Sequence, residues 1–260
     1  MSHTENTPLL EVRNLKKYFG KKDRVLHAVD DISVTIQQGK TLGVVGESGC
    51  GKSTIAGILA AKNRGYTGRI TLGGVPLSEV AETDLMKHVV LVRHNSYLFK
   101  GTVEENLRMA EPDATKEEME AVLQKVNLLG FLQTQNGLQT ELLEKAGNLS
   151  GGQCQRLVIA RALLRSDSAV YIFDEAASNI DVESEELIMN VIHELAKTKT
   201  VLLISHRLAN VVQSDQIYFL KNGTICERGT HAELMEQNGA YRHLYDSQMV
   251  LENYGKEGNA

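Results

Sequence analysis

Short apolar runs, each bounded by charged or turn-forming residues, recur along the chain and predict β-strands. Two of these runs, residues 169–173 and 201–204, are apolar throughout, as in strands buried on both faces of a parallel sheet. Residues 217–220 and 224–227 flank an Asn-Gly pair that predicts a hairpin. The other predicted strands span residues 9–12, 25–36, 41–45, 68–72 and 89–92. The pattern favours an α/β fold.

Residues 94–165 follow a helical pattern instead. Thr115 and Glu118 are spaced as a capping box, and apolar side chains follow at helical spacing at Met119, Val122, Leu123 and Val126. We therefore expect a single domain over residues 1–250. Its core spans residues 9–93 and 166–249, its inserted helical subdomain spans residues 94–165, and residues 251–260 form a polar, frayed tail.

Composition narrows the function classes. The chain has 260 residues, of which 42% are hydrophobic, enough for one α/β domain with an insertion. Its formal net charge of −5 gives no reason to expect nucleic acid as a partner. Three scattered cysteines do not form a disulfide framework or a zinc motif. No window reaches the roughly 20 apolar residues that span a bilayer, so we expect any membrane role to act through partner subunits.

A glycine-rich segment follows the predicted strand 41–45 and opens a predicted helix over residues 52–61. Such a segment curls its N–H groups around an anion at a helix N-terminus. Lys52 would reach the β- and γ-phosphates of a nucleotide, and the Ser53 hydroxyl would bind Mg²⁺. The segment consists of Gly46, Glu47, Ser48, Gly49, Cys50, Gly51, Lys52, Ser53 and Thr54.

Three further features carry candidate chemistry. A second anion-binding helix N-terminus is predicted where Ser150 would cap the helix that follows Gly151, Gly152 and Gln153. Asp174-Glu175 and Ser205-His206 end the two apolar strands, where ligands bind in open α/β sheets. Tyr18 and Phe19 either stack on a nucleobase or close a small sheet.

Five motifs of this chain, in their order along the sequence, resemble those of the ATP-binding cassette (ABC) ATPases. They are the phosphate loop, the LSGGQ sequence at residues 149–153, Asp174-Glu175, the sequence at residues 178–181 and the sequence ending in His206. The resemblance covers residues 9–249. It implies a P-loop NTPase core with a mainly parallel sheet, an N-terminal antiparallel β subdomain and an inserted α-helical subdomain. It also implies ATP and Mg²⁺ as ligands.

The resemblance implies a role for each matching residue. Lys52 contacts phosphate, Ser53 and Asp174 hold Mg²⁺, and Thr54 lies beside them. Glu175 is the general base that polarises water, and His206 is the switch histidine at the γ-phosphate. Phe19 stacks on adenine, with Tyr18 as the alternative. Asp181 lies in the loop that crosses a dimer interface, and the signature residues serve the nucleotide of a second ABC subunit, identical or different: Ser150, Gly151, Gly152 and Gln153.

One position departs from the family pattern. His94 occupies the place of a glutamine that usually touches Mg²⁺ and links to the helical subdomain. A neutral imidazole offers one acceptor nitrogen, with an unperturbed pKa near 6.5 that makes this charge-dependent. We hypothesise that His94 alters the Mg²⁺ or pH dependence of hydrolysis.

Two sub-family resemblances meet in this chain. Residues 9–54 resemble ATPase subunits of oligopeptide, dipeptide and nickel importers, whereas residues from 68 onward resemble exporter cassettes. We expect a separate subunit, since residues 1–10 are typical of a native start; a cassette cut or recombined from a longer chain stays open. We expect ATP hydrolysis at the cytoplasmic face of a membrane, coupled to transport through transmembrane permease subunits.

Two alternatives stay open at this point. The first is a soluble ABC ATPase that is not tied to transport, and the second is a regulatory cassette that hydrolyses ATP weakly. Long coiled coils or basic arms would favour the first, and neither is visible. Glu175 and His206 oppose the second, while His94 keeps it open. Transport direction and cargo are left undetermined.

Overall fold

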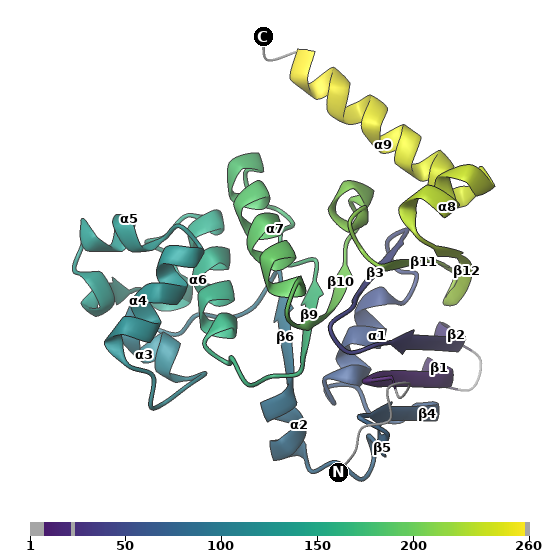
Figure 1. Ribbon diagram of the computed structural model, residues 1–260, viewed down its shortest axis with the longest axis horizontal. Coiled ribbons are helices and arrows are strands. Elements are labelled where there is room, and N and C mark those ends of the chain that lie inside the picture. The colour runs from purple at the N-terminus through teal and green to yellow at the C-terminus, as the bar shows by residue number, and fades with distance from the viewer. Residues whose placement is uncertain (1–7, 22–23, 258–260) are drawn as a thin grey trace.

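The structure is a computed structural model that describes residues 8–21 and 24–257. Within these residues, the central sheet has six strands in the order β12-β11-β3-β10-β9-β6 (Figure 1). All pairings are parallel except that of β11 with β12, which form the predicted hairpin around Asn222-Gly223. The strands are β3 (Thr41–Gly46), β6 (Val89–Arg93), β9 (Val170–Asp174), β10 (Thr200–Ile204), β11 (Gln216–Lys221) and β12 (Thr224–Gly229).

The middle strands of this sheet are buried along their whole length. Every residue of β3, β9 and β10 is buried, which confirms the prediction from their continuous apolar runs. Side chains alternate between two hydrophobic clusters on opposite faces of the sheet. Phe173 and Leu203 belong to one cluster, and their neighbours Ile172 and Leu202 belong to the other.

An antiparallel sheet in the order β2-β1-β4-β5 forms the N-terminal part. Its strands are β1 (Leu10–Lys21), β2 (Arg24–Ile36), β4 (Thr67–Leu72) and β5 (Val75–Pro76). Strand β1 extends far beyond the predicted residues 9–12. Its second half is rich in lysine and lacks the apolar pattern used for the prediction, but an antiparallel strand can keep one face in solvent. The sequence at residues 20–23 also predicts a turn. This prediction is wrong at Gly20 and Lys21, which lie in β1; residues 22–23 are outside the described residues.

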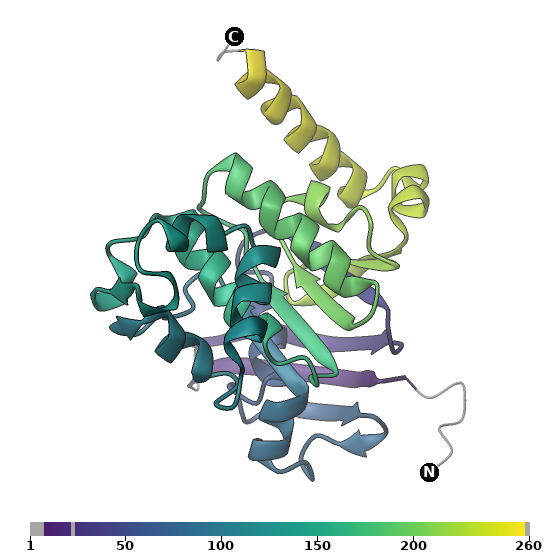
Figure 2. The ribbon, with the colours of Figure 1, turned by 60° about the vertical axis from the view of Figure 1, so that its left-hand side comes forward.

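Residues 94–165 are mainly helical, as predicted, and lie to one side of the central sheet (Figures 1 and 2). The Thr115–Glu118 capping box is present, and Met119, Val122 and Leu123 are buried. A short strand pair that the sequence did not suggest also lies here. The elements are β7 (Gly101–Thr102), α3 (Val103–Arg108), α4 (Lys116–Lys125), α5 (Leu129–Gln133), η1 (Gly137–Gln139), β8 (Glu141–Leu142), η2 (Glu144–Ala146) and α6 (Gly151–Leu163).

Helices cover both faces of the central sheet. Helix α1 (Lys52–Leu59) contributes Ile55 and Ile58 to one cluster, while α6 and α7 (Val182–Ala196) belong to the other. The remaining helical elements are α2 (Glu82–His88), η3 (Leu208–Val211), α8 (His231–Gln237) and α9 (Ala240–Glu257). The helices that carry the phosphate loop and the signature sequence therefore lie on opposite faces.

Helix α9 corrects the expectation of a frayed tail. The predicted break after Val250 is absent, because the helix continues to Glu257 and projects from the body of the molecule (Figures 1 and 2). Its sequence contains no proline, and Leu, Glu and Lys favour helix. Among residues 8–21 and 24–257, no helix is both long and apolar enough to cross a bilayer.

Candidate nucleotide site

The phosphate loop joins the C-terminal end of β3 to α1, as predicted. Two of its glycines are required by close backbone approach: a Cβ at Gly46 would lie 2.1 Å from the Leu220 carbonyl oxygen, and one at Gly51 would lie 2.1 Å from that of Ala28. Gly51 is also the N-cap of α1, with φ of 103° and no side-chain cap. The first amides of α1 are therefore left for an anion.

Lys52 lies inside this loop. Its side chain is 4% exposed. Its ammonium donates hydrogen bonds to the carbonyl oxygens of Gly46 at 2.7 Å and Glu47 at 2.9 Å. The ammonium also lies 3.5 Å from the Cys50 sulfur. These contacts fold the positive charge back over the loop whose amides face an incoming phosphate.

Ser53 and Asp174 meet at the base of the loop. The Ser53 hydroxyl donates to Asp174 Oδ1 at 2.8 Å, and Asp174 is 3% exposed at the end of β9. Hydroxyl and carboxylate oxygens are hard donors of the kind that Mg²⁺ prefers. In the described part of the chain no group of three His, Cys, Asp or Glu side chains gathers. That fits Mg²⁺, which usually binds one or two protein oxygens and completes its shell with phosphate and water.

Arg93 is a member of this cluster that the sequence reasoning missed. Its Nε lies 3.3 Å from Asp174 Oδ2 and is buried without a hydrogen-bond partner in the described structure. The parallel register of β6 and β9 pairs Arg93 directly with Asp174. The signal was available in principle, because both residues end strands of one parallel sheet. A positive charge thus flanks the carboxylate that is predicted to hold the metal.

His94 follows Arg93 in an exposed turn. Within the described residues it makes no hydrogen bond, ion pair or ring contact, whereas Gln155 of α6 donates to the Arg93 carbonyl oxygen at 3.2 Å. The structure therefore does not connect His94 to Ser53 or Asp174 by a direct bond. Its proposed effect on Mg²⁺ stays a prediction.

Glu175 and His206 come together at the ends of neighbouring strands, as predicted. Glu175 Oε1 lies 3.9 Å from His206 Nδ1, because β9 and β10 pair in parallel with Ile204 opposite Asp174. The Glu175 amide donates to the Ile204 carbonyl oxygen at 3.0 Å. Glu175 has a φ of 53°, a conformation that costs energy in residues with a side chain and clusters at functional sites.

The signature residues form the N-terminus of α6. Ser150 Oγ accepts from the Gln153 amide at 3.2 Å, and Gln153 Oε1 accepts from the Ser150 amide at 2.9 Å, so the predicted cap is a full capping box. A Cβ at Gly152 would lie 2.2 Å from Ser184 Oγ on α7. Glycine at this position lets the two helix N-termini touch.

Asp181 lies at that contact. Its Oδ1 accepts from the Ser184 amide at 2.8 Å, and its Oδ2 would lie 3.0 Å from a Cβ at Gly152. The hydrogen bond from the Ser184 backbone lowers the pKa of Asp181, and that from the Ser184 side chain adds to it. The structure thus joins the signature sequence to the segment at residues 178–181, whereas no hydrogen bond between described residues joins it to the phosphate loop.

Tyr18 and Phe19 are exposed neighbours on β1 and point to opposite faces of the strand. Tyr18 stacks on His27 with ring centroids 4.0 Å apart and donates to Asp30 Oδ1 at 2.5 Å. This hydrogen bond raises the pKa of Tyr18 and lowers that of Asp30. The Lys17 ammonium lies 4.8 Å from the centre of the Phe19 ring. Which aromatic meets a base stays a prediction.

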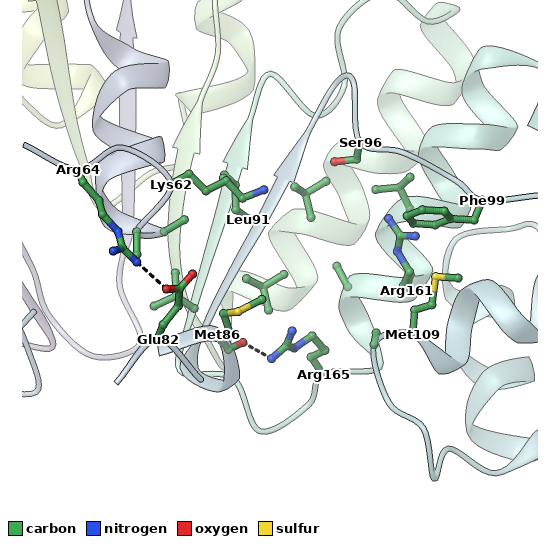
Figure 3. A pocket seen from close by; sticks show the side chains of 18 residues that line it. Lys62, Arg64, Glu82, Met86, Leu91, Ser96, Phe99, Met109, Arg161 and Arg165 are labelled. Atoms are coloured by element: carbon green, nitrogen blue, oxygen red, sulfur yellow. Dashed lines mark hydrogen bonds and ion pairs between the residues drawn. The ribbon is translucent and has the colours of Figure 1, made fainter. Parts of the chain in front are cut away.

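A groove of about 620 Å³ separates the core from the helical subdomain (Figure 3). Exposed apolar side chains line it, including Met86, Phe99 and Met109. Arg161 donates to the Tyr97 carbonyl oxygen at 2.9 Å and Arg165 to that of Met86. Burial lowers the pKa of Arg161. No carboxylate in the described residues pairs with either arginine, so the groove combines apolar surface with positive charge.

Comparisons with known proteins identify the family of this chain. The family described as ABC transporter matches residues 29–178. An uncharacterised ABC transporter ATP-binding protein of Haemophilus influenzae is 43% identical over 256 residues, which are 98% of this chain and 45% of that protein. An ATP-dependent lipid A-core flippase of Vibrio cholerae is 43% identical over 220 residues, covering 84% of this chain and 38% of the flippase.

A solved structure of a bacterial Atm1-family ABC exporter with ATP bound superposes with a TM-score of 0.84 at 30% identity, covering 95% of this chain and 43% of the exporter. The chain belongs to the ABC transporter family, and it is an ATP-binding ATPase cassette of that family. It spans less than half the length of these relatives. The expected fold class and family are confirmed; the importer-like character of residues 9–54 stays a prediction.

Proposed function

We propose that this cassette hydrolyses ATP with Mg²⁺ at the phosphate-loop site and that closure of a dimer couples hydrolysis to transport across a membrane. One observation carries the proposal: Lys52, Ser53, Asp174, Glu175 and His206 lie at the C-terminal ends of three adjacent parallel strands. This is the edge at which open α/β sheets bind ligands. Five separate groups with compatible roles converge there.

Each residue has a part that its surroundings support. The free amides at the start of α1 and the Lys52 ammonium bind the phosphates, with Lys52 exchanging its carbonyl partners for phosphate oxygens. Ser53 and Asp174 hold Mg²⁺, which neutralises charge on the phosphate oxygens. Glu175 accepts a proton from the attacking water, and His206 donates a hydrogen bond toward the γ-phosphate.

A second cassette completes the site. Helices α1 and α6 lie on opposite faces of the central sheet, so the signature residues of one chain are separated by that sheet from its own phosphate loop. Two chains facing each other would bring Ser150 of one to the nucleotide of the other. Asp181 beside Gly152 then lies at the same interface. Because hydrolysis needs both chains, it depends on closure of the dimer. This closing motion is what can be coupled to transport.

The groove in Figure 3 offers a docking place for a membrane domain at the cytoplasmic face. Its exposed Phe99 and Met109 would bury apolar side chains of a short helix, and Arg161 and Arg165 would pair with acidic residues on that helix. Two of the relatives named above are called a lipid A-core flippase and an ABC exporter. Both names describe transport, which supports a membrane domain as the partner of this groove.

Co-purification from native membranes tests the proposal. We expect the tagged protein to isolate with membrane-spanning polypeptides or as part of one. Phe99→Asp should reduce the association of the cassette with the membrane domain, and the stimulation of its ATPase rate by that domain, about ten-fold or more. Val75→Asp, on the exposed edge strand β5, is the matched control and should change neither. Isolation without any membrane-spanning partner would overturn the transport reading while leaving ATP hydrolysis intact.

A further inference from the structure

Helix α9 reaches back to the segment that carries His206. The Gln248 side chain donates from Nε2 to the His206 carbonyl oxygen at 2.7 Å and accepts at Oε1 from the Leu208 amide at 2.8 Å. The two bonds fix the orientation of the amide, because a carbonyl needs a donor and an N–H needs an acceptor. One side chain thus bridges the main chain across residues 206–208.

Other contacts fix the neighbours of His206, whereas the contact of its own imidazole is a longer one, 3.9 Å from Nδ1 to Glu175 Oε1. Ser205 donates from its amide to the Val44 carbonyl oxygen at 3.2 Å, Arg207 pairs with Glu185, and the Leu208 side chain is fully buried. The His206 side chain is 52% exposed. Among the described residues, only Gln248 forms a hydrogen bond to the His206 carbonyl oxygen or the Leu208 amide.

The start of α9 is anchored firmly to the core. The Glu227 carboxylate on β12 accepts from the amides of Ala240 at 2.5 Å and Tyr241 at 3.0 Å. The Tyr241 ring is fully buried, and its hydroxyl lies 2.8 Å from His231 Nδ1 on α8. A helix held in this way presents Gln248 at a fixed place, two turns along from Tyr241. The clamp is therefore a built contact between two anchored elements.

We propose that Gln248 is a positioning residue for hydrolysis: by clamping residues 206–208 it sets the place of the His206 imidazole relative to the γ-phosphate. The inference rests on the role proposed above for His206. It assigns part of the control of hydrolysis to α9, which carries none of the ABC motifs. Movement of α9, for example by a bound partner, would then change the rate without touching the nucleotide.

Three variants separate the two hydrogen bonds. Gln248→Met keeps the length and helix propensity of the side chain but removes both bonds. Gln248→Glu keeps an acceptor for the Leu208 amide but cannot donate to the His206 carbonyl oxygen. Ser247→Ala is the matched control, because among the described residues the Ser247 hydroxyl donates only to the His243 carbonyl oxygen within the same helix.

Two measurements on the protein isolated from its membranes test the proposal. The first is the steady-state ATPase rate, for which we expect kcat to fall about five- to fifty-fold in Gln248→Met and Gln248→Glu, with KM for ATP changed less than about two-fold. The second is hydrogen exchange of the Leu208 amide, which should be faster in Gln248→Met and stay protected in Gln248→Glu. Ser247→Ala should match wild type in both.

His206→Ala distinguishes the possible failures. A wild-type rate in His206→Ala would overturn the role of His206 itself. A slow His206→Ala beside a wild-type kcat in Gln248→Met would overturn only the positioning role of Gln248, and so would an equal loss in Ser247→Ala. If Gln248→Met unfolds, Gln248→Glu decides alone, since its retained Leu208 protection reports an intact segment.

Discussion

The phosphate loop and the signature sequence are both helix N-termini, and the structure prepares them differently. At α1 the cap is Gly51, which has no side chain to occupy the first amides of the helix. At α6 the cap is Ser150, which forms a capping box with Gln153. The first, open end has no side-chain cap, whereas the second, closed end has a full capping box that leaves the Gly151 and Gly152 amides without a hydrogen bond in the described structure.

This difference suits one chain that carries two halves of a nucleotide site, the phosphate loop at α1 and the signature sequence at α6. Lys52 and Ser53 are held near the open end by the core itself, so we expect that half to bind nucleotide without a second chain. The Ser150 hydroxyl and the Gln153 side chain each already accept one backbone hydrogen bond, and a capping interaction is worth about 1 kcal/mol. The Ser150 O–H is still free to donate to a phosphate. In the function proposed above, this end acts only when a second cassette presents its nucleotide.

The largest expected effect lies at the open end. Lys52→Ala removes the buried ammonium, and we expect nucleotide affinity to fall about a hundred-fold or more, since a buried charge-assisted contact to phosphate is lost. Equilibrium titration with a fluorescent ATP analogue measures it. Lys116→Ala, on the exposed face of α4, is the control. Unchanged affinity in Lys52→Ala would remove the phosphate-loop assignment.

Glu175→Gln should separate binding from chemistry. The amide cannot accept a proton, so we expect the hydrolysis rate to fall about 10²- to 10⁴-fold while ATP still binds. An ATP-bound dimer should then accumulate and be visible by size-exclusion chromatography with light scattering. Glu186→Gln, exposed on α7, controls for the loss of charge. Normal turnover would exclude Glu175 as the base.

Ser150→Ala tests the closed end directly. We expect the loss of the cap to lower the free energy of unfolding by about 1 kcal/mol. Nucleotide affinity of the single chain should not change, whereas the hydrolysis rate of the dimer should fall about ten-fold, because one hydrogen bond to the partner's phosphate is removed. A matching loss of affinity in the single chain would contradict the division into two half-sites.

Arg93→Met sharpens the metal end of the comparison. The guanidinium beside Asp174 opposes a second cation at the same carboxylate, so its removal should lower the Mg²⁺ concentration for half-maximal binding by about three- to ten-fold, the range of a part-exposed ion pair. Mn²⁺ binding followed by electron paramagnetic resonance reads this without turnover. His94→Gln tests the hypothesis that His94 alters the Mg²⁺ or pH dependence of hydrolysis. If the Mg²⁺ response, the hydrolysis rate and the pH profile of this variant all match wild type, His94 has no such role.

Asp181→Asn should give the smallest effect. The pKa of Asp181 is lower in the folded than in the unfolded protein, so its carboxylate stabilises the fold fully at pH values above the unfolded pKa near 3.9. This stabilisation is lost as the pH falls through the folded-state pKa. Asparagine keeps the cap but does not titrate. The Tm of the variant should therefore decline less between pH 5 and pH 3, and an identical acid profile would contradict the cause given for the shift.

The local sequence determined most of the elements and the first half of the site. Glycines and a lysine at fixed spacing between β3 and α1 predict the loop because its geometry depends on adjacent residues, and the capping boxes at Thr115 and Ser150 act over three residues. The buried strands β9 and β10 follow from uninterrupted apolar runs. These features were predictable because their physical causes are near neighbours in the chain.

The sequence also placed Glu175 beside His206, but the tertiary structure decided the other contacts between distant side chains. Arg93 reaches Asp174 through the register of two parallel strands, and Gln248 reaches His206 from 42 residues away. The contact of Gly152 with Ser184 depends on how α6 packs on α7. Each depends on strand register or helix packing set by the whole core, because a hydrogen bond between remote residues leaves no periodic trace in the sequence.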